Sequence, residues 1–324
     1  MKVKTKIAIT GMGLEIPGWQ GRNAHELLAG SVAYGEFNPA QRLGKKGLRY
    51  KDRATLLAMC AVHKALEDRG VLELEHPQRA GYGVCVSSNL GNMDTVCLQS
   101  QVINNEHVDA TSPMSLPVAS SNVIPASIAI RYGCKAVNLM LCNGATSGVD
   151  ALHIAAKMLI SGRAEKMLVV GVEPLNEISR RLLSECDPET RTGAGAEPGE
   201  LAACVILERL GEDAAAQVYG TIGEYEFIAA GAEAGIGLGR PSVWFVPAQT
   251  TERSRSLVAK LQADGYSGVP VLDVSSNTGE LYGALGVLQA QVAVSHLAQA
   301  GGGQALVSNG FTFGDGLSSI QIDR

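Results

Sequence analysis

Short apolar runs alternate with longer segments of helical periodicity along most of the chain. Runs rich in β-branched residues predict strands at residues 6–10, 81–87, 136–141, 166–172, 202–208, 271–274, 304–308 and 318–322. Apolar residues that recur every three to four positions predict helices at residues 50–69, 118–132, 147–161 and 286–300. Apolar strands that alternate with helices are typical of α/β proteins whose sheets are covered by helices.

Glycine marks the ends of several predicted elements. Gly11 and Gly13 are expected to close the first strand, and Gly162 is expected to end a long helix as a left-handed cap. No Pro- or Ser-rich linker and no tandem repeat interrupts the chain. We therefore expect one compact unit in which residues 1–210 and 211–324 form two strand–helix halves that share a core.

Composition narrows the class of protein. The 324 residues are 46% hydrophobic, which is ample for a large core, and the net charge is −5 without a run of basic residues. This charge pattern argues against a nucleic-acid partner, and no stretch of 18 uninterrupted apolar residues suggests a membrane span. The N-terminal residues alternate polar and apolar, as in a strand rather than a signal peptide, so a cytoplasmic protein is expected.

Cysteine usage does not indicate a cofactor or metal site. The seven cysteines contain no CxxC pair and are scattered through apolar segments. We expect buried, reduced thiols and neither a metal ion nor a cofactor.

Residues 138–173 carry the most informative motif, NLMLCNGATSGVDALHIAAKMLISGRAEKMLVVGVE. It resembles the nucleophile segment of β-ketoacyl synthases, in which a strand enters a sharp turn that carries cysteine and Ser-Gly then starts a helix. Further motifs follow the order of that family: ITGMG at 9–13, PGELAACVILE at 198–208, TGELYGALG at 278–286 and SNGFTFGD at 308–315. The resemblance implies a thiolase-like layered αβαβα fold, made of two similar halves that share one core.

The residues that would carry out condensation are missing at the matching positions. A condensing enzyme needs a thiolate nucleophile, imidazoles and oriented backbone N–H groups. The resemblance places the nucleophile position at Ala145, whose methyl group cannot carry an acyl thioester. It places the two histidine positions at Gln249, within the turn at 247–251, and at Glu280, and it places a lysine position at Ser275. A Gln side chain cannot titrate near neutral pH, and a carboxylate would repel a developing enolate.

The histidine count supports this interpretation without any alignment. The chain has six histidines, and only one of them lies in the C-terminal half: His25, His63, His76, His107, His153 and His296. Two imidazoles cannot therefore converge from C-terminal loops, and we expect no intact catalytic set. His153, on the helix after the turn, is expected to be a packed or hydrogen-bonded histidine rather than a base.

Two alternatives remain open. Cys142 could be a displaced nucleophile of a divergent acyltransferase, because Cys142-Asn143-Gly144 resembles the Cys-x-Gly of the acyl-CoA-primed branch of the superfamily. That register breaks the spacing to Gly148 and supplies no histidine, so a buried strand thiol is the favoured interpretation. The other alternative is a homodimeric scaffold that binds an acyl group or a carrier protein.

A preserved scaffold without its catalytic residues resembles the chain-length factor of type II polyketide systems. That resemblance implies a heterodimer with an active ketosynthase, to which an acyl carrier protein delivers the growing chain. Family members associate through segments that match about 137–141, with Asn138 and Met140, and about 109–122. The expected wall of the partner's acyl tunnel would use Met114, Leu116 and Val118, for which ordinary interface packing is the alternative.

Overall fold

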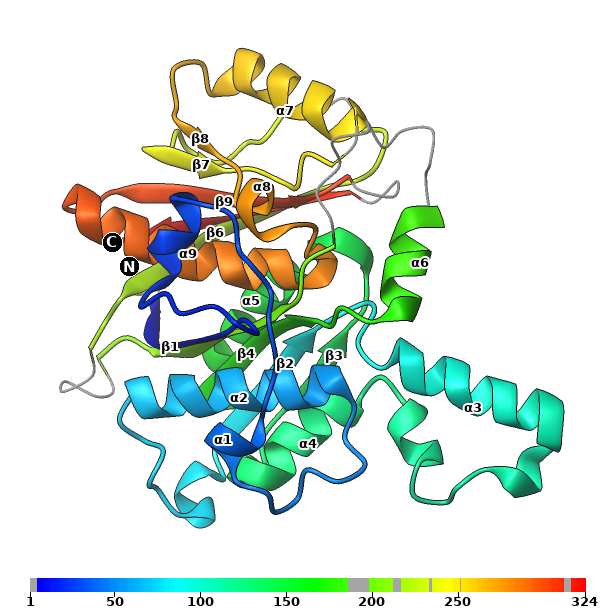
Figure 1. The fold of residues 1–324 in the computed structure, drawn as a ribbon. Helices are drawn as coiled ribbons and strands as arrows, with labels where there is room; N and C mark the ends of the chain where they lie inside the picture. The colour runs from blue at the N-terminus through cyan, green and yellow to red at the C-terminus, as the bar shows by residue number, and fades with distance from the viewer. Residues whose placement is uncertain (1–4, 186–197, 212–216, 233–234, 251, 312–315) are drawn as a thin grey trace.

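Five layers of helices and strands make up the molecule in the computed structural model (Figure 1). The structure describes residues 5–185, 198–211, 217–232, 235–250, 252–311 and 316–324. From one outer face to the other, the layers are a helix pair, a group of strands, a second helix pair, a second group of strands and a single helix. The helices of these layers are α2 (Arg53–Asp68) with α4 (Val123–Tyr132), then α5 (Ser147–Ile160) with α9 (Leu285–Ala300), then α7 (Glu252–Gly265).

The strands form a continuous sheet in the order β3-β2-β4-β5-β1-β6-β10-β9-β7-β8. The first five strands are ordered 3-2-4-5-1, and the last five, taken from the opposite edge, are ordered 8-7-9-10-6, which is the same arrangement advanced by five. The two groups join where β1 pairs antiparallel with β6. Their bounds are β1 (Ile7–Glu15), β2 (Tyr82–Ser87), β3 (Asn138–Leu141), β4 (Lys166–Glu173), β5 (Leu201–Arg209), β6 (Gly220–Ile228), β7 (Val243–Phe245), β8 (Val271–Leu272), β9 (Gln304–Gly310) and β10 (Leu317–Asp323). The predicted layered α/β fold is confirmed.

Each helical layer has its own apolar cluster. Leu152 of α5 and Val287 of α9 pack in the central cluster, which also takes side chains from both groups of strands. Leu57 of α2 belongs to a second cluster, and Leu261 of α7 packs with Trp244 in a third. Burial of each large side chain contributes about 1.5–3 kcal/mol, so these clusters supply most of the stabilisation.

The first strand is longer than predicted. We expected Gly11 and Gly13 to close it, but β1 continues through both glycines to Glu15. A Cβ built on Gly13 would lie 2.1 Å from the carbonyl oxygen of Ala61 in α2. Glycine therefore lets the helix approach the strand backbone here instead of making a turn.

Several other elements differ from the prediction. The helix expected at 118–132 is split, because the turn η4 (Leu116–Ala119) ends before α4 begins at Val123. Polar or weakly patterned segments form elements that the pattern did not predict, among them β6, β7, α7, α3 (Met93–Glu106) and α6 (Glu177–Glu185). The remaining short elements are α1 (Ala40–Leu43), α8 (Ser275–Thr278), η1 (Ala24–Leu28), η2 (His76–Arg79), η3 (Val108–Ala110), η5 (Gly144–Thr146) and η6 (Tyr282–Ala284).

Across the ranges that the structure describes, no helix is both long and apolar enough to cross a bilayer.

Candidate functional site

The turn between β3 and α5 holds the position where a nucleophile was expected. The chain leaves β3 at Leu141, passes through η5 and enters α5 at Ser147. Gly144 has a φ of +83°, which glycine adopts at low cost. Ala145 follows it at the start of the helix and is only 1% exposed. A buried methyl group thus lies where the helix N-terminus would stabilise a thiolate.

Asn89 fixes this turn from the loop after β2. Its Oδ1 accepts a hydrogen bond from the Gly144 N–H at 3.0 Å, and its Nδ2 donates to the Gly144 carbonyl at 2.9 Å. The Ser147 hydroxyl also donates to that carbonyl, at 2.7 Å. Because both backbone groups of Gly144 are used, the turn keeps a rigid shape. Sequence reasoning missed Asn89, which lies 55 residues before the turn.

A buried carboxylate, Glu173 at the end of β4, joins three segments behind the turn. Its two oxygens accept hydrogen bonds from the Ser88 hydroxyl and from the backbone N–H groups of Asn89, Leu90 and Gly283, at 2.7–3.2 Å. Burial raises the pKa of Glu173 to about 7, although these hydrogen bonds oppose the shift. The carboxyl group thereby fixes the loop after β2 against the loop after α8.

Gln249 and Ser275 are brought together around Asp273. The carboxyl group of Asp273 accepts hydrogen bonds from the Ser275 N–H at 2.9 Å and from its hydroxyl at 2.6 Å. Burial raises the pKa of Asp273, and hydrogen bonds from Ser275 and from the Gln249 side chain partly offset that rise. Two positions expected to match a lysine and a histidine therefore share one polar cluster. Residue 251, in the turn expected to carry Gln249, lies outside the described residues.

Glu280 is hydrogen-bonded both to its own loop and to the turn that carries Gln249. Its side chain accepts hydrogen bonds from the Thr250 hydroxyl at 3.1 Å and from the Tyr282 N–H at 2.7 Å. Its backbone carbonyl accepts from the Gly199 N–H at 2.9 Å. The following turn, η6, contacts η5, so the loop that carries Glu280 lies beside the turn that carries Ala145. A Cβ on Gly148 would lie 2.9 Å from the Gly283 carbonyl, which shows how closely the two segments approach.

Asp150, one turn into α5, is a second polar centre that the sequence did not reveal. One of its oxygens accepts from the Thr146 hydroxyl at 2.8 Å and from the Asn143 side chain. The other accepts from the Tyr225 hydroxyl at 2.8 Å and from Ser318 at 2.5 Å. Asp150 therefore ties the turn to β6 and β10. The signal was absent because β6, which carries Tyr225, was not predicted.

A cavity of about 530 Å³ opens beside this centre and is lined by Cys142, Asn143, Asp150, His153 and Tyr225, among others. The His153 ring stacks on the Tyr225 ring at 3.9 Å between centroids, as expected of a packed histidine. Burial lowers the pKa of His153. The imidazole is thus neutral and engaged with an aromatic ring.

Cys142 lies at the end of β3 and is exposed, which contradicts the expected buried thiol. It is exposed because β3 is the edge strand and only β2 pairs with it. Desolvation and the nearby Glu173 raise the pKa of Cys142, although a hydrogen bond with Ser121 lowers it. At neutral pH this cysteine is mostly the thiol form, which is a poor nucleophile.

We expect iodoacetamide to label Cys142 ahead of the buried cysteines, yet more slowly than a free cysteine at pH 7. Cys60, Cys85, Cys134 and Cys204 are all buried, and burial raises the pKa of each. Peptide mass spectrometry over time at pH 7 and pH 9 measures the rates, with Cys142→Ser as the control. Labelling faster than free cysteine at pH 7 would contradict this expectation and support an activated Cys142.

The segments expected to form an interface lie at one edge of the molecule. α3 and the turns after it stand away from the layered body (Figure 1). Large apolar side chains are exposed here, with Met114 at 60% and Leu116 at 43%, and Val118 is partly exposed. On β3, Asn138 is exposed and Met140 is partly buried against the core. We call the segment at 93–122 the apolar arm.

Comparison with known proteins gives a consistent result. A profile described as beta-ketoacyl synthase, N-terminal domain, matches residues 35–213, more than half of the chain. A 3-oxoacyl-[acyl-carrier-protein] synthase 2 of Coxiella burnetii is 28% identical over 190 residues, which cover 54% of this chain and 46% of that protein. The chain spans about half the length of such curated relatives.

Solved structures match over nearly the whole chain. A beta-ketoacyl synthase from Burkholderia phymatum has a TM-score of 0.83 at 17% identity and covers 99% of this chain and 100% of that one. The ishigamide ketosynthase/chain length factor has a TM-score of 0.79 at 21% identity, covering 98% of this chain and 99% of that one. At these identities the likeness shows a common fold.

Proposed function

The chain belongs to the β-ketoacyl synthase family, and from this we propose that it is a non-catalytic subunit of the chain-length-factor type. In this proposal it pairs with an active ketosynthase and shapes that partner's acyl tunnel. An acyl carrier protein would deliver the growing chain to the complex.

The observation that carries the proposal is the buried methyl group of Ala145 at the strand-to-helix turn. Loss of a catalytic nucleophile lowers kcat on the order of 10⁶-fold in a well-studied hydrolase. Here Gln249 and Glu280 also occupy the positions expected for the histidines, so no residue of the set could take over. Asn89 and Glu173 hold the backbone around Ala145 in a defined conformation although the nucleophile is absent, which fits a binding role.

Two features support a protein partner. β3 is an edge strand whose outer side has no neighbouring strand among the described residues, and the apolar arm beside it exposes several large side chains. Exposed strand edges and contiguous apolar surface are typical of interfaces between subunits. One protein of similar fold is a ketosynthase/chain length factor, which makes a ketosynthase a suitable partner to test.

Native mass spectrometry of the chain, alone and co-expressed with a ketosynthase from the same organism, tests the proposal. We expect a one-to-one complex, and condensation of malonyl units only when the partner keeps its cysteine. Condensation by this chain alone would overturn the non-catalytic role. A stable homodimer that ignores the ketosynthase would instead favour the scaffold alternative.

The acyltransferase alternative has less support. The Cys142 thiol has a raised pKa. Among the described residues that line its cavity, the candidate base is His153, whose neutral ring is stacked on Tyr225. Acyl transfer would require a thiolate that neither group generates.

A further inference from the structure

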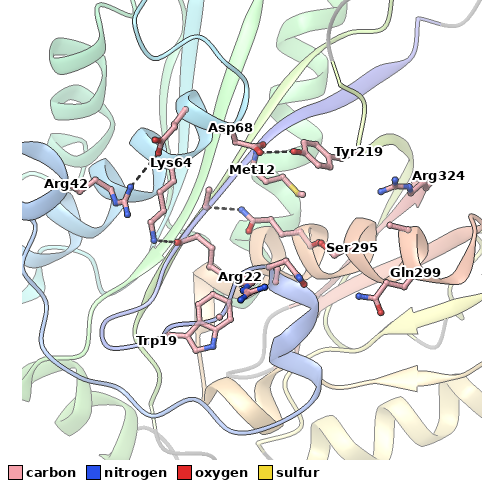
Figure 2. A pocket seen from close by; sticks show the side chains of 18 residues that line it. Met12, Trp19, Arg22, Arg42, Lys64, Asp68, Tyr219, Ser295, Gln299 and Arg324 are labelled. Atoms are coloured by element: carbon pink, nitrogen blue, oxygen red, sulfur yellow. Dashed lines mark hydrogen bonds and ion pairs between the residues drawn. The ribbon is translucent and has the colours of Figure 1, made fainter.

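A second cavity, of about 660 Å³, lies far from the turn that carries Ala145 (Figure 2). Its walls come from β1, from the segment at 19–24, from the last turns of α2 and from the C-terminal part of α9. α9 begins at Leu285 beside the turn, and Ser295 lines the cavity ten residues later, about 15 Å along the helix axis. The volume falls within the usual range for small-molecule sites.

The cavity has an excess of positive charge. Its lining includes four cationic side chains, Arg22, Arg42, Lys64 and Arg324, and two acidic ones, Glu67 and Asp68. Most of these groups are already engaged with protein atoms. Lys64 pairs with Glu15 at 2.8 Å, and Asp68 accepts from the Tyr219 hydroxyl and the Met12 N–H, both at 2.8 Å.

Arg22 is the exception. Within the described ranges, its guanidinium makes no hydrogen bond or ion pair, and Figure 2 places it between the wall formed by Lys64 and the wall formed by Ser295. Its backbone N–H donates to Glu26 Oε1 at 3.2 Å, so the main chain is held while the long side chain reaches the cavity. Arg22 is exposed, and its unpaired guanidinium can offer two parallel N–H groups to a carboxylate or a phosphate.

Apolar surface adjoins Arg22. Trp19 forms one wall, and Met12 and Leu14 form another. A Cβ on Gly21 would lie 2.0 Å from the Trp19 ring, so the chain folds directly over the indole before it reaches Arg22. The ring is therefore packed against the backbone that leads to Arg22, so the apolar wall is already formed before a ligand binds.

We propose that this cavity binds a small organic anion, an oxyanion carried on a compact apolar body. Arg22 holds the carboxylate or phosphate head, and the body lies against Trp19 and Met12. This site is independent of the proposed subunit role, because it shares no residue with the turn, the apolar arm or β3.

Isothermal titration calorimetry tests this site, with the whole chain either alone or bound to its proposed ketosynthase partner. The probes are benzoate, phenyl phosphate, inorganic phosphate and benzyl alcohol. We expect phenyl phosphate or benzoate to bind with a Kd of about 1 mM or below, and we expect inorganic phosphate and benzyl alcohol to bind at least tenfold more weakly. The stronger of the two anions identifies the head group.

Arg22→Gln should weaken that binding about 10- to 100-fold, because it removes a hydrogen-bonding partner that carries a charge. Arg163→Gln is the matched control, since Arg163 is an exposed arginine outside the cavity, and it should leave Kd unchanged. Thermal unfolding of both variants checks that they fold. Absence of binding by both aromatic anions, or binding that Arg22→Gln does not weaken, would overturn the proposal.

Discussion

Replacing Glu173 with alanine should lower the free energy of unfolding by about 3–5 kcal/mol. The change would leave three backbone N–H groups and the Ser88 hydroxyl without their acceptor in a buried site. Urea denaturation measures the effect. Glu185→Ala is the control, because Glu185 is an exposed member of a surface ion pair and should change stability by less than about 1 kcal/mol.

The pH dependence gives a second test of the same carboxyl group. Its pKa is about 7 in the folded protein against the model-compound value of 4.5. Between these two values the folded state keeps a proton that the unfolded state has released, so stability should fall as pH rises through this window. Glu173→Gln should remove this contribution to the dependence of the free energy of unfolding on pH. A slope of the opposite sign, or one unchanged in the Gln variant, would contradict the assigned shift.

Charges placed on the apolar arm should strongly weaken association with a ketosynthase. We expect Met114 and Leu116 to be buried in that interface. The double variant Met114→Asp, Leu116→Asp should then weaken binding at least about 100-fold. Each change loses about 1.5–3 kcal/mol of apolar burial and also forces a carboxylate to lose its water. Both side chains are exposed in the isolated chain, so its stability should barely change. Analytical ultracentrifugation of the mixed subunits measures the affinity.

Leu210→Asp is the matched control for this experiment. Leu210 is 47% exposed, close to the 43% of Leu116, but it follows β5 and lies outside the arm. It should leave association intact. Binding that survives the double change on the arm would place the partner surface elsewhere.

The sequence predicted best those elements whose burial follows a simple period. β4 and α5 were placed to within a residue or two because nearly every inward position is apolar. α3 was missed because its apolar residues are interspersed with polar ones without a clear helical period, and only Gln99 of its side chains is buried. α7 was missed because its first turns are rich in charged and polar residues.

Motif spacing predicts which positions match the site but cannot predict their hydrogen bonds. The assignment of Ala145 to the nucleophile position rests on local register and stays a prediction, although the structure does place Ala145 in the turn before α5. Asp150 could not be linked to Tyr225, because the two are 75 residues apart and one lies on an unpredicted strand. The exposure of Cys142 depends on β3 being an edge strand, which is a property of the strand order rather than of the local sequence.

The strand order also has a consequence for how the chain is made in the cell. The strands β1–β5 are complete once Arg209 is synthesised, yet α5 packs against α9, which ends at Ala300. Translation of the intervening residues, roughly 90 of them, takes about 5–20 s, during which the apolar face of α5 is uncovered. We therefore expect nascent chains stalled before α9 to be retained by a holding chaperone, and release to coincide with emergence of that helix.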